Sequence, residues 1–457
     1  MDALTPPSRA ASTAARDSYG RLLALLAAAT NDLPAAEDAL ADAFERALRT
    51  WPSRGVPGNP DAWLLTVARN RLRDEWKSAR AQRDISLEAD LDALAPGGVL
   101  ACFDDIDLDS IPDRRLELML VCAHPAIDPA MRTPLTLNTV LGFTAEQVGR
   151  AFSVPPRTMA TRLVRAKKRI KATGIPFRIP DQADLPARMA SVMEAIYGAY
   201  VIDWTTGPQA RQFPPEAVFV AEAPVPSETP VPSETPEAAA PPETLAPPET
   251  LAPPEALHLA EVLATLVPGD PEARGLAALI ELSLARAPAR VDADGRFVPL
   301  ADQDPSLWNP RLITSAHQHL RAAHARGRLG RFQLEAAIQA VHCARQHGGT
   351  TDWPALLPLH RALRAIAPSL GSGVALAAVT AEVSGPAAGL SMLDALPDQE
   401  GEPARRFQPA QATRAHLLER LGRHEEAVAA YERAIGLTHE TAEREYLERR
   451  RDRAGRQ

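Results

Sequence analysis

Cysteines and aromatic residues are scarce in this chain, and each shortage excludes a class of protein. The three cysteines, Cys102, Cys122 and Cys343, are scattered over 457 residues. No pair has the C-x-x-C spacing of a zinc site, and the set is too sparse for a disulfide framework, so we expect a reducing, cytoplasmic setting. Aromatic residues make up only 5% of the chain, while alanine, leucine and arginine dominate. This composition favours helices over sheets.

Targeting and membrane signals are also missing. The N-terminus has no basic segment followed by an apolar one, as a signal peptide would have. Its longest apolar run, residues 22–29, is too short to cross a bilayer. We therefore expect a soluble, intracellular protein that has no membrane partner.

Motifs of the common enzyme classes do not occur either. The chain has no P-loop, no H-E-x-x-H and no G-x-S-x-G sequence. Residues 370–373 (LGSG) are too short to cradle a phosphate, and we interpret them as a loop that connects two helices. His124 has a single cysteine near it, so we expect a structural role rather than a metal site. The sequence therefore predicts no enzymatic activity, no metal and no cofactor.

The overall charge hides a strong asymmetry between segments. The net charge is −8, which does not by itself suggest a nucleic acid as partner. Residues 157–171 nevertheless contain seven lysine or arginine residues and no acidic residue, whereas residues 85–113 contain eight acidic residues and no basic one. The charge therefore has to be interpreted segment by segment.

Residues 144–171 (TAEQVGRAFSVPPRTMATRLVRAKKRIK) are the most informative segment. Thr144 and Gln147 form a T-x-x-Q capping box that begins a helix. Pro155 and Pro156 suit the first turn of a second helix, where a missing N–H costs little. The pattern predicts two short helices joined by a tight turn, which is a helix-turn-helix.

The second of these helices has two different faces. Its apolar stripe recurs at helical spacing and consists of Met159, Leu163, Ala166 and Ile170. The opposite face is basic and consists of Arg157, Thr161, Arg165 and Lys168. Such side chains suit the phosphates and base edges of a DNA major groove. The alternative is an ordinary amphipathic helix whose basic face is solvated.

Residues 17–84 predict another helical domain, with helices over 19–29, 35–51 and from residue 60 to about residue 80, the last capped by Asn59. One face of this third helix combines an aromatic ring, an amide and two cations, from Trp63, Asn70, Arg73 and Lys77. Rings can stack on bases, amides can bond base edges and cations can hold phosphates, so the face suits DNA whose strands are separating. The alternative is that Trp63 packs in a core and the cations are solvated.

Composition divides the chain into six segments. Two helical domains cover residues 1–84 and 114–175, and the acidic residues 85–113 between them are interpreted as a flexible linker, with folding over the basic faces as the alternative. Residues 176–213 continue with helical spacing as a connecting helix. Residues 214–256 repeat VPSETP and APPETL and predict an extended proline-rich linker.

The last segment, residues 257–457, returns to helix-rich sequence. Residues 415–437 (AHLLERLGRHEEAVAAYERAIGL) match the spacing of a tetratricopeptide hairpin, with weaker units at 333–344, 356–367 and 374–396. Such repeats stack into a curved solenoid. We therefore predict an all-α protein that ends in a helical-repeat domain, with an ordinary helical domain as the alternative.

The order of these segments resembles a bacterial RNA polymerase sigma factor, of the compact sigma-70 type called extracytoplasmic-function. Residues 17–84, with EDALADAFERALRTW and WLLTVARNRLRDEW, resemble region 2, and residues 114–175 resemble region 4. Residues 117–180, 292–310 and 421–435 are similar to a subgroup with a long C-terminal helical-repeat extension. The proline-rich stretch is longer and more biased than its counterpart in that subgroup.

The resemblance implies partners and roles. The partners are promoter DNA and core RNA polymerase, through the β′ clamp helices and the β flap. Contacts to the β′ clamp helices fall to Asp38, Asp42, Phe44 and Leu48. A loop with Trp51 and Arg54 would capture a flipped base of the minus-ten element, together with the face of Trp63, Asn70, Arg73 and Lys77. The minus-thirty-five element would be read by Arg157, Thr158, Thr161, Arg162, Arg165 and Lys168.

Two points qualify these expectations. Ala160 stands where many relatives have arginine, so the minus-thirty-five sequence is expected to differ from the commonest one. A conventional helix-turn-helix regulator with a repeat sensor domain would explain residues 144–171 and 257–457, but not the Trp51, Trp63 and Asn70 face. The extension is expected to regulate activity and to bind any regulatory partner.

Overall fold

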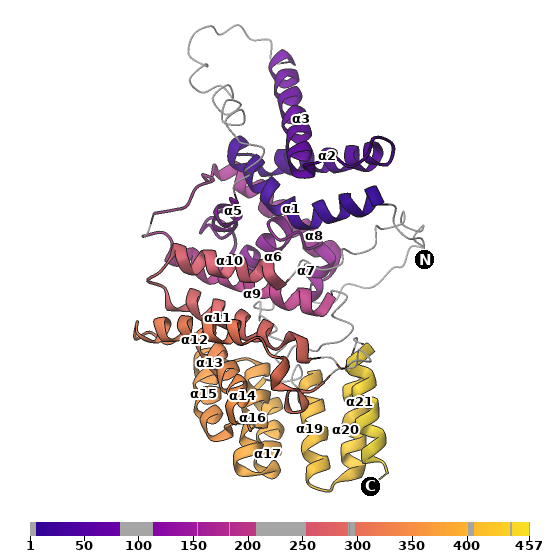
Figure 1. Cartoon of the computed structure of the whole chain (residues 1–457), viewed down its shortest axis with the longest axis vertical. Coiled ribbons are helices and arrows are strands. Elements are labelled where there is room, and N and C mark those ends of the chain that lie inside the picture. Colours follow the sequence, from indigo (N-terminus) through magenta and orange to yellow (C-terminus); the bar gives the residue numbers. More distant parts are fainter. Residues whose placement is uncertain are drawn as a thin grey trace. The chain divides into compact units, whose positions relative to one another are not determined.

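The computed structural model describes residues 6–82, 113–152, 154–181, 183–206, 253–290, 292, 298–348, 350–400, 406–438 and 441–456. These residues form helices and the turns between them and contain no strand, which confirms the all-α fold (Figure 1). The described residues divide into two compact units, one up to Ala199 and the other from Tyr200 onward. Most of the acidic and proline-rich linkers predicted from the sequence lies outside the described residues.

The first unit begins with three helices that pack on one another. They are α1 (Pro6–Thr30), α2 (Leu33–Arg54) and α3 (Pro60–Gln82). Leu23 of α1, Leu40 of α2 and Leu65 of α3 are fully buried in this core. The expected cap is confirmed, because the Asn59 side chain accepts a 3.0 Å hydrogen bond from the Ala62 amide. The predicted helices of residues 17–84 are therefore present.

The remaining helices of this unit follow the acidic segment. They are α5 (Arg115–Cys122), α6 (Pro129–Thr139), α7 (Ala145–Ala151), α8 (Pro156–Thr173) and most of α9 (Pro186–Thr206). The sequence pattern did not single out α6, which Asp128 caps and which contains Pro134. Helix α1 contacts α5, and α2 contacts α8. The two domains predicted as separate therefore pack together in one unit.

The second unit stacks further helices, and those close in sequence contact each other. They are α10 (Pro253–Leu266), α11 (Pro271–Ala285), α12 (Pro310–His324), α13 (Arg331–Cys343), α14 (Arg345–Gly348), α15 (Trp353–Ile366), α16 (Leu370–Ser384), α17 (Pro386–Glu400), α19 (Gln408–Arg420), α20 (His424–Leu437) and α21 (Thr441–Ala454). Short 3₁₀ turns precede α12 at residues 287–289, 300–302 and 305–307. The helical hairpin expected at residues 415–437 is formed by α19 and α20, with Tyr431 buried between them.

Two predictions about this unit are wrong. Residues 374–396 do not form one continuous element, because Gly385 at φ 92° separates α16 from α17. A residue with a side chain would be strained at that backbone angle. Residues 370–373 are not a connecting loop either. Ser369 and Ser372 bond each other's backbone amides in a capping box, so these residues are the first turn of α16.

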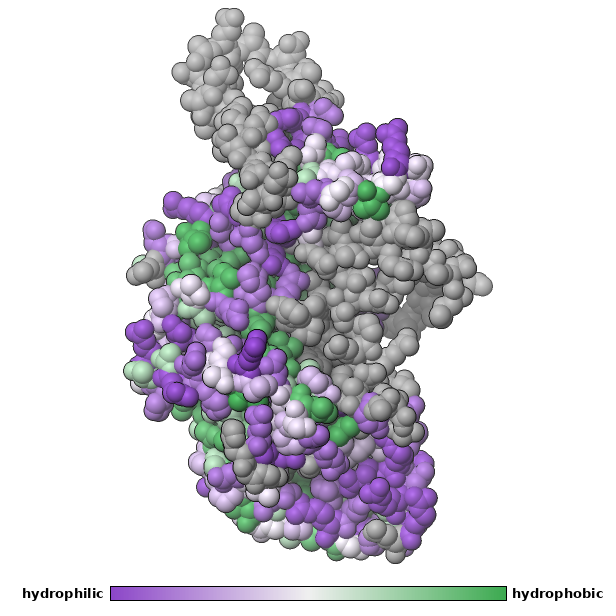
Figure 2. Space-filling view, viewed as in Figure 1, coloured by the Kyte–Doolittle hydropathy of each residue, from purple (hydrophilic) through white to green (hydrophobic). Residues whose placement is uncertain are grey.

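Hydrophilic residues cover much of the drawn face over α20 and α21 (Figure 2). The sequence of α21, TAEREYLERRRDRA, accounts for this with six arginine or glutamate side chains in its last ten residues alone and few apolar ones. None of the described helices is both long enough and apolar enough to span a membrane.

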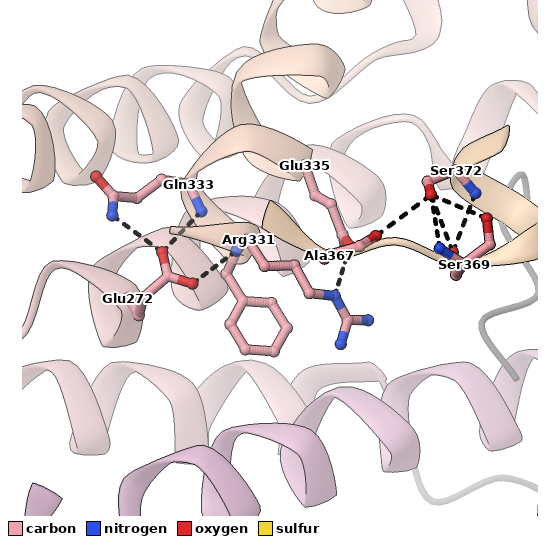
Figure 3. Close-up of polar contacts among 8 residues, drawn as sticks. Glu272, Arg331, Gln333, Glu335, Ala367, Ser369 and Ser372 are labelled. Carbon is pink, nitrogen blue, oxygen red and sulfur yellow. Dashed lines mark hydrogen bonds and ion pairs between the residues drawn. The ribbon is translucent and has the colours of Figure 1, made fainter. Parts of the chain in front are cut away.

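A carboxylate joins two helices of the second unit. Glu272 of α11 accepts hydrogen bonds from the Phe332 amide at 2.8 Å, the Gln333 amide at 3.2 Å and the Gln333 side-chain amide at 2.9 Å (Figure 3). These amides belong to the first turn of α13, where backbone donors have no partner inside the helix. Glu272 therefore caps α13 from outside and fixes it to α11.

Candidate nucleic-acid interface

Helix α8 presents the basic face that the sequence predicted. The apolar stripe is buried, with Met159, Leu163, Ala166 and Ile170 at most 6% exposed. All six side chains predicted to read DNA are exposed, namely Arg157, Thr158, Thr161, Arg162, Arg165 and Lys168. A helix with one buried stripe and an exposed cationic face of about one turn in width fits a major groove.

The turn between α7 and α8 fixes this helix. The capping box at Thr144 is present, because the Gln147 amide donates to its hydroxyl at 3.2 Å and the Gln147 side chain accepts from the Thr144 amide at 2.8 Å. A Cβ atom on Gly149 would lie 2.7 Å from the Val154 carbonyl oxygen. The two helices therefore approach as closely as a glycine allows. Both predicted caps of the helix-turn-helix are confirmed.

One polar group of this face is already used inside the helix. The Thr161 hydroxyl donates to the Arg157 carbonyl at 2.9 Å. This local bond satisfies the donor of the hydroxyl and leaves its methyl group facing outward as an apolar contact.

The second predicted DNA surface lies on α3. Asn70 is exposed, and Trp63 and Arg73 are half-buried. Arg54 is exposed at the end of α2. Lys77 belongs to α3, but its side chain is outside the described residues. The predicted face therefore exists for the three described members of the set on α3.

Trp51 is a correction to the expected geometry. The resemblance placed Trp51 and Arg54 in a loop, but both belong to α2, which continues through Pro52. Trp51 is only 2% exposed and meets Trp63 edge to face, with ring centroids 5.6 Å apart and planes at 64°. A ring buried this far supports Trp63 instead of meeting solvent. Aromatic pairs in this arrangement stabilise each other.

The residues predicted to bind polymerase lie along α2. Asp38 and Asp42 are exposed, and Leu48 is 37% exposed. The Asp42 carboxylate lies 2.6 Å from the Arg71 guanidinium of α3. Phe44 is half-buried and stacks on Tyr19 of α1 at 6.4 Å. Three of the four side chains are thus open to a partner.

Sequence patterns missed a pair of contacts between α2 and α8. Lys167 lies 2.7 Å from the Glu37 carboxylate, and Lys171 lies 2.5 Å from that of Asp32. Lysines four residues apart on one helix and acids five apart on another hint at such pairing. Nothing in the sequence alone, however, says which two helices meet.

Burial changes the chemistry of the groups near this contact. Burial raises the pKa of Glu37 despite the opposing charge of Lys167. Burial first, and the Glu37 charge second, raise the pKa of Tyr19 well above its usual range. The pKa of the Cys122 thiol is raised to about 12, mainly by burial. A thiol this buried is unreactive at neutral pH.

Metal and enzyme chemistry find no support among the described residues. No cluster of three histidine, cysteine or acidic side chains able to hold a metal occurs within them. The Nδ1 atom of His124 accepts a 3.0 Å hydrogen bond from the Ala126 amide, which fits the predicted structural role.

Comparison with known proteins places two parts of the chain. Residues 15–82 match the family model of sigma-70 region 2, which spans the described parts of α1, α2 and α3. Residues 246–324 match a family of unknown function, DUF6596, and include α10, α11 and α12. The Rhizobium meliloti (strain 1021) protein named Uncharacterized protein R00370 is 33% identical over 428 residues, which cover 91% of this chain and 89% of that protein. No solved structure matches.

Proposed function

This chain belongs to the sigma-70 family, and from that premise we propose that it is an extracytoplasmic-function sigma factor that directs core RNA polymerase through two separate DNA-binding surfaces. The family itself carries a role in promoter recognition and transcription initiation, with core polymerase and promoter DNA as partners. The observation that carries the finer proposal is the pairing of a region 2 domain with a second, exposed basic helix, α8.

The upstream surface is the basic face of α8. Arg162 and Arg165 are exposed and would bond phosphates or guanine edges in the minus-thirty-five element. The methyl group of Thr161 would contact an apolar base substituent such as the thymine methyl. Ala160 offers no hydrogen-bond donor beside it, so the preferred sequence should differ from one read by arginine.

The downstream surface is the α3 face. The ring of Trp63, held against Trp51, would stack on or wedge beside a base of the separated minus-ten strands. Asn70 would bond the edge of that base, and Arg73 and Lys77 would hold phosphates. Capture of an unstacked base offsets the few kcal/mol that unstacking costs, and this would drive melting.

Polymerase binding falls to α2, in this proposal, through Asp38, Asp42, Phe44 and Leu48 against the β′ clamp helices. The domain of α5 to α8 would meet the β flap. Two DNA-binding surfaces of modest strength on one polymerase gain affinity through effective concentration. The chain itself would catalyse nothing, because the active site for RNA synthesis belongs to the polymerase.

The second unit is proposed to regulate this activity. It is a stack of helices of the kind that presents an extended binding surface, as tetratricopeptide repeats do. A chain ending at Thr206 should then respond differently from the full chain in transcription. Equal activity and equal response of both chains would contradict the regulatory role.

Run-off transcription with purified core polymerase on a library of random promoter sequences tests the whole proposal. We expect enriched transcripts that share two spaced upstream elements. Tight binding to duplex DNA without polymerase, and no transcripts, would instead indicate a conventional helix-turn-helix regulator.

A further inference from the structure

Helix α8 has a third side that faces neither the core nor the predicted DNA. Helical periodicity places Lys167 and Lys171 on the flank next to the apolar stripe, away from Arg162 and Arg165. Both lysines reach across to α2, where Lys167 pairs with Glu37 and Lys171 pairs with Asp32, at 2.7 and 2.5 Å. The basic helix is thus tied to the region 2 domain by two ion pairs.

The inner ion pair is removed from water. Lys167 and Glu37 have side chains that are each 17% exposed, whereas Lys171 is 60% exposed. A buried pair gains little net stability, but loss of one partner leaves a buried charge that costs several kcal/mol. The contact is therefore weak overall and sensitive to any change of one side chain.

A second contact joins the same two parts of the chain. Gly20 of α1 packs on the carbonyl of Val140, at the end of α6, so closely that a Cβ atom there would overlap the oxygen. Alanine is otherwise the better helix former by about 1 kcal/mol. A glycine at this point of α1 therefore matters for the contact and not for the helix.

The contact also occupies the side of α2 predicted to bind polymerase. Glu37, Phe44 and Leu48 are spaced i, i+7 and i+11, which puts them on one stripe of the helix. Helix α8 touches α2 at Glu37. A polymerase helix that lies along this stripe would meet α8 at its N-terminal end.

The dimensions of the unit give a third argument. From Arg157 to Lys167 is about 15 Å along α8, and from Glu37 to Trp51 about 21 Å along α2, at 1.5 Å per residue. With about 10 Å between the helix axes, the two DNA surfaces lie at most about 46 Å apart by this path. Elements centred near minus ten and minus thirty-five are about 25 base pairs, or roughly 85 Å, apart on straight DNA. The packed unit is too short to reach both.

We propose that the free chain is closed by the contact of α8 with α2, and that core RNA polymerase binds the stripe of Glu37, Phe44 and Leu48 and releases α8 to reach the minus-thirty-five element. The inference rests on the proposed function for the identity of the partner. The closed state would keep the chain from occupying a promoter without polymerase, because only one of its two surfaces could bind at a time.

Spin labels on the full-length chain measure this opening. We would place them at Arg46→Cys on α2 and Ala172→Cys on α8, two exposed positions, in a Cys102→Ser background. The other two cysteines, Cys122 and Cys343, are buried. The free chain should give one narrow, short distance, and saturating core polymerase should shift it to a longer one.

Two variants should open the free chain. Gly20→Ala creates the overlap with Val140, and its control is Gly436→Ala, a helical glycine with open space around it. Lys167→Glu places a second carboxylate against Glu37, and its control is Arg169→Glu on the exposed face of the same helix. Both variants should lengthen the distance without polymerase, and the double swap Glu37→Lys/Lys167→Glu should restore the short one.

Affinity gives an independent readout. If closure leaves only about a tenth of the free chain competent to bind, Gly20→Ala should bind core polymerase about tenfold more tightly than the wild type. A long distance in the free wild type, a short distance in both variants, or a short distance in the polymerase complex would each overturn the closed state or its release. A chain that neither binds polymerase nor supports run-off transcription, yet shows the short free distance, would refute the proposed function and the polymerase-driven release while leaving the closure observed.

Discussion

Arginine serves opposite purposes in the two units of this protein. On α8, Arg157, Arg162 and Arg165 stand in solvent. In the second unit, Arg450 of α21 lies 2.6 Å from Glu419 of α19 and 3.0 Å from the Nδ1 atom of His416. Exposed arginines contribute little to folding and are available to phosphates, whereas enclosed ones hold helices together. The same substitution should therefore affect binding in one unit and stability in the other.

Charge reversal on α8 should have the largest effect. Arg165→Glu removes a cation from the proposed DNA face and adds repulsion with phosphate, so promoter binding by the polymerase complex should fall about 100-fold, or about 2.7 kcal/mol. The dependence on salt should weaken by about one contact. The thermal midpoint should not change, because the side chain is exposed. Fluorescence anisotropy over a salt series checks this, with Arg178→Glu, an exposed residue beyond α8, as control. A lower midpoint with unchanged binding would assign Arg165 to the fold.

The converse is expected for Arg450→Ala. It leaves Glu419, which is 13% exposed, with only the Tyr431 hydroxyl at 2.8 Å as a partner. Burial tends to raise the pKa of Glu419, but the bonds from Arg450 and Tyr431 lower it overall. Loss of the arginine should cost about 2 kcal/mol of unfolding free energy. Chemical denaturation at pH 7 measures this cost.

The pH dependence sharpens that result. A carboxyl whose pKa is lowered by folding contributes stability above its ordinary pKa, and this stability is lost as the pH falls. Wild type should therefore lose stability in acid more steeply than Arg450→Ala. Promoter binding should be the same for both proteins, and a large loss of binding in Arg450→Ala would break the division between the two units.

The aromatic pair predicts a smaller effect. Trp63→Ala removes the ring proposed to meet a separated base, and should lower transcription about tenfold on duplex promoters. A template whose minus-ten region is already unpaired should recover most of that loss, because its melting costs nothing. Arg165→Glu should not recover on the same template. Equal recovery of both variants would show that the two surfaces do not differ in what they bind.

A buried carboxyl in the second unit predicts the smallest change. Glu281 of α11 is 1% exposed, and burial raises its pKa to about 7. A raised pKa means that the stability contributed by this group is full below pH 4.5 and is lost as the pH rises through about 7. Unfolding free energy should therefore fall by about 1 kcal/mol from pH 6 to pH 8, and Glu281→Gln should abolish this fall. Denaturation curves at both pH values decide it, and a parallel decline in the variant would exclude Glu281 as the cause.

Local sequence signals predicted local structure well. The caps at Thr144 and Asn59 and the apolar stripe of α8 depend on residues a few positions apart, and the structure contains all three. Such features need no knowledge of distant segments. The boundaries of α2 and α16 were misjudged for the opposite reason. Pro52 and the glycines at 371 and 373 look like loop residues, yet tertiary packing keeps each inside a helix.

Long-range contacts were beyond the sequence. The edge-to-face packing of Trp51 on Trp63 joins two helices, and the pairing of Lys167 with Glu37 joins residues that are far apart in the chain. Charge and aromatic content show that such residues need partners, but not which ones. The exposure of the α8 cations was predictable, whereas the contact that holds α8 against α2 was not.

The most direct test of the two-surface account is a parallel selection of random promoters by wild type, Arg165→Ala and Trp63→Ala in complex with core polymerase. We predict that Arg165→Ala erases sequence preference in the upstream element only, and that Trp63→Ala weakens preference in the downstream element only. Loss of both elements in either variant, or of neither element in both, would contradict the assignment of α8 and α3 to separate parts of the promoter.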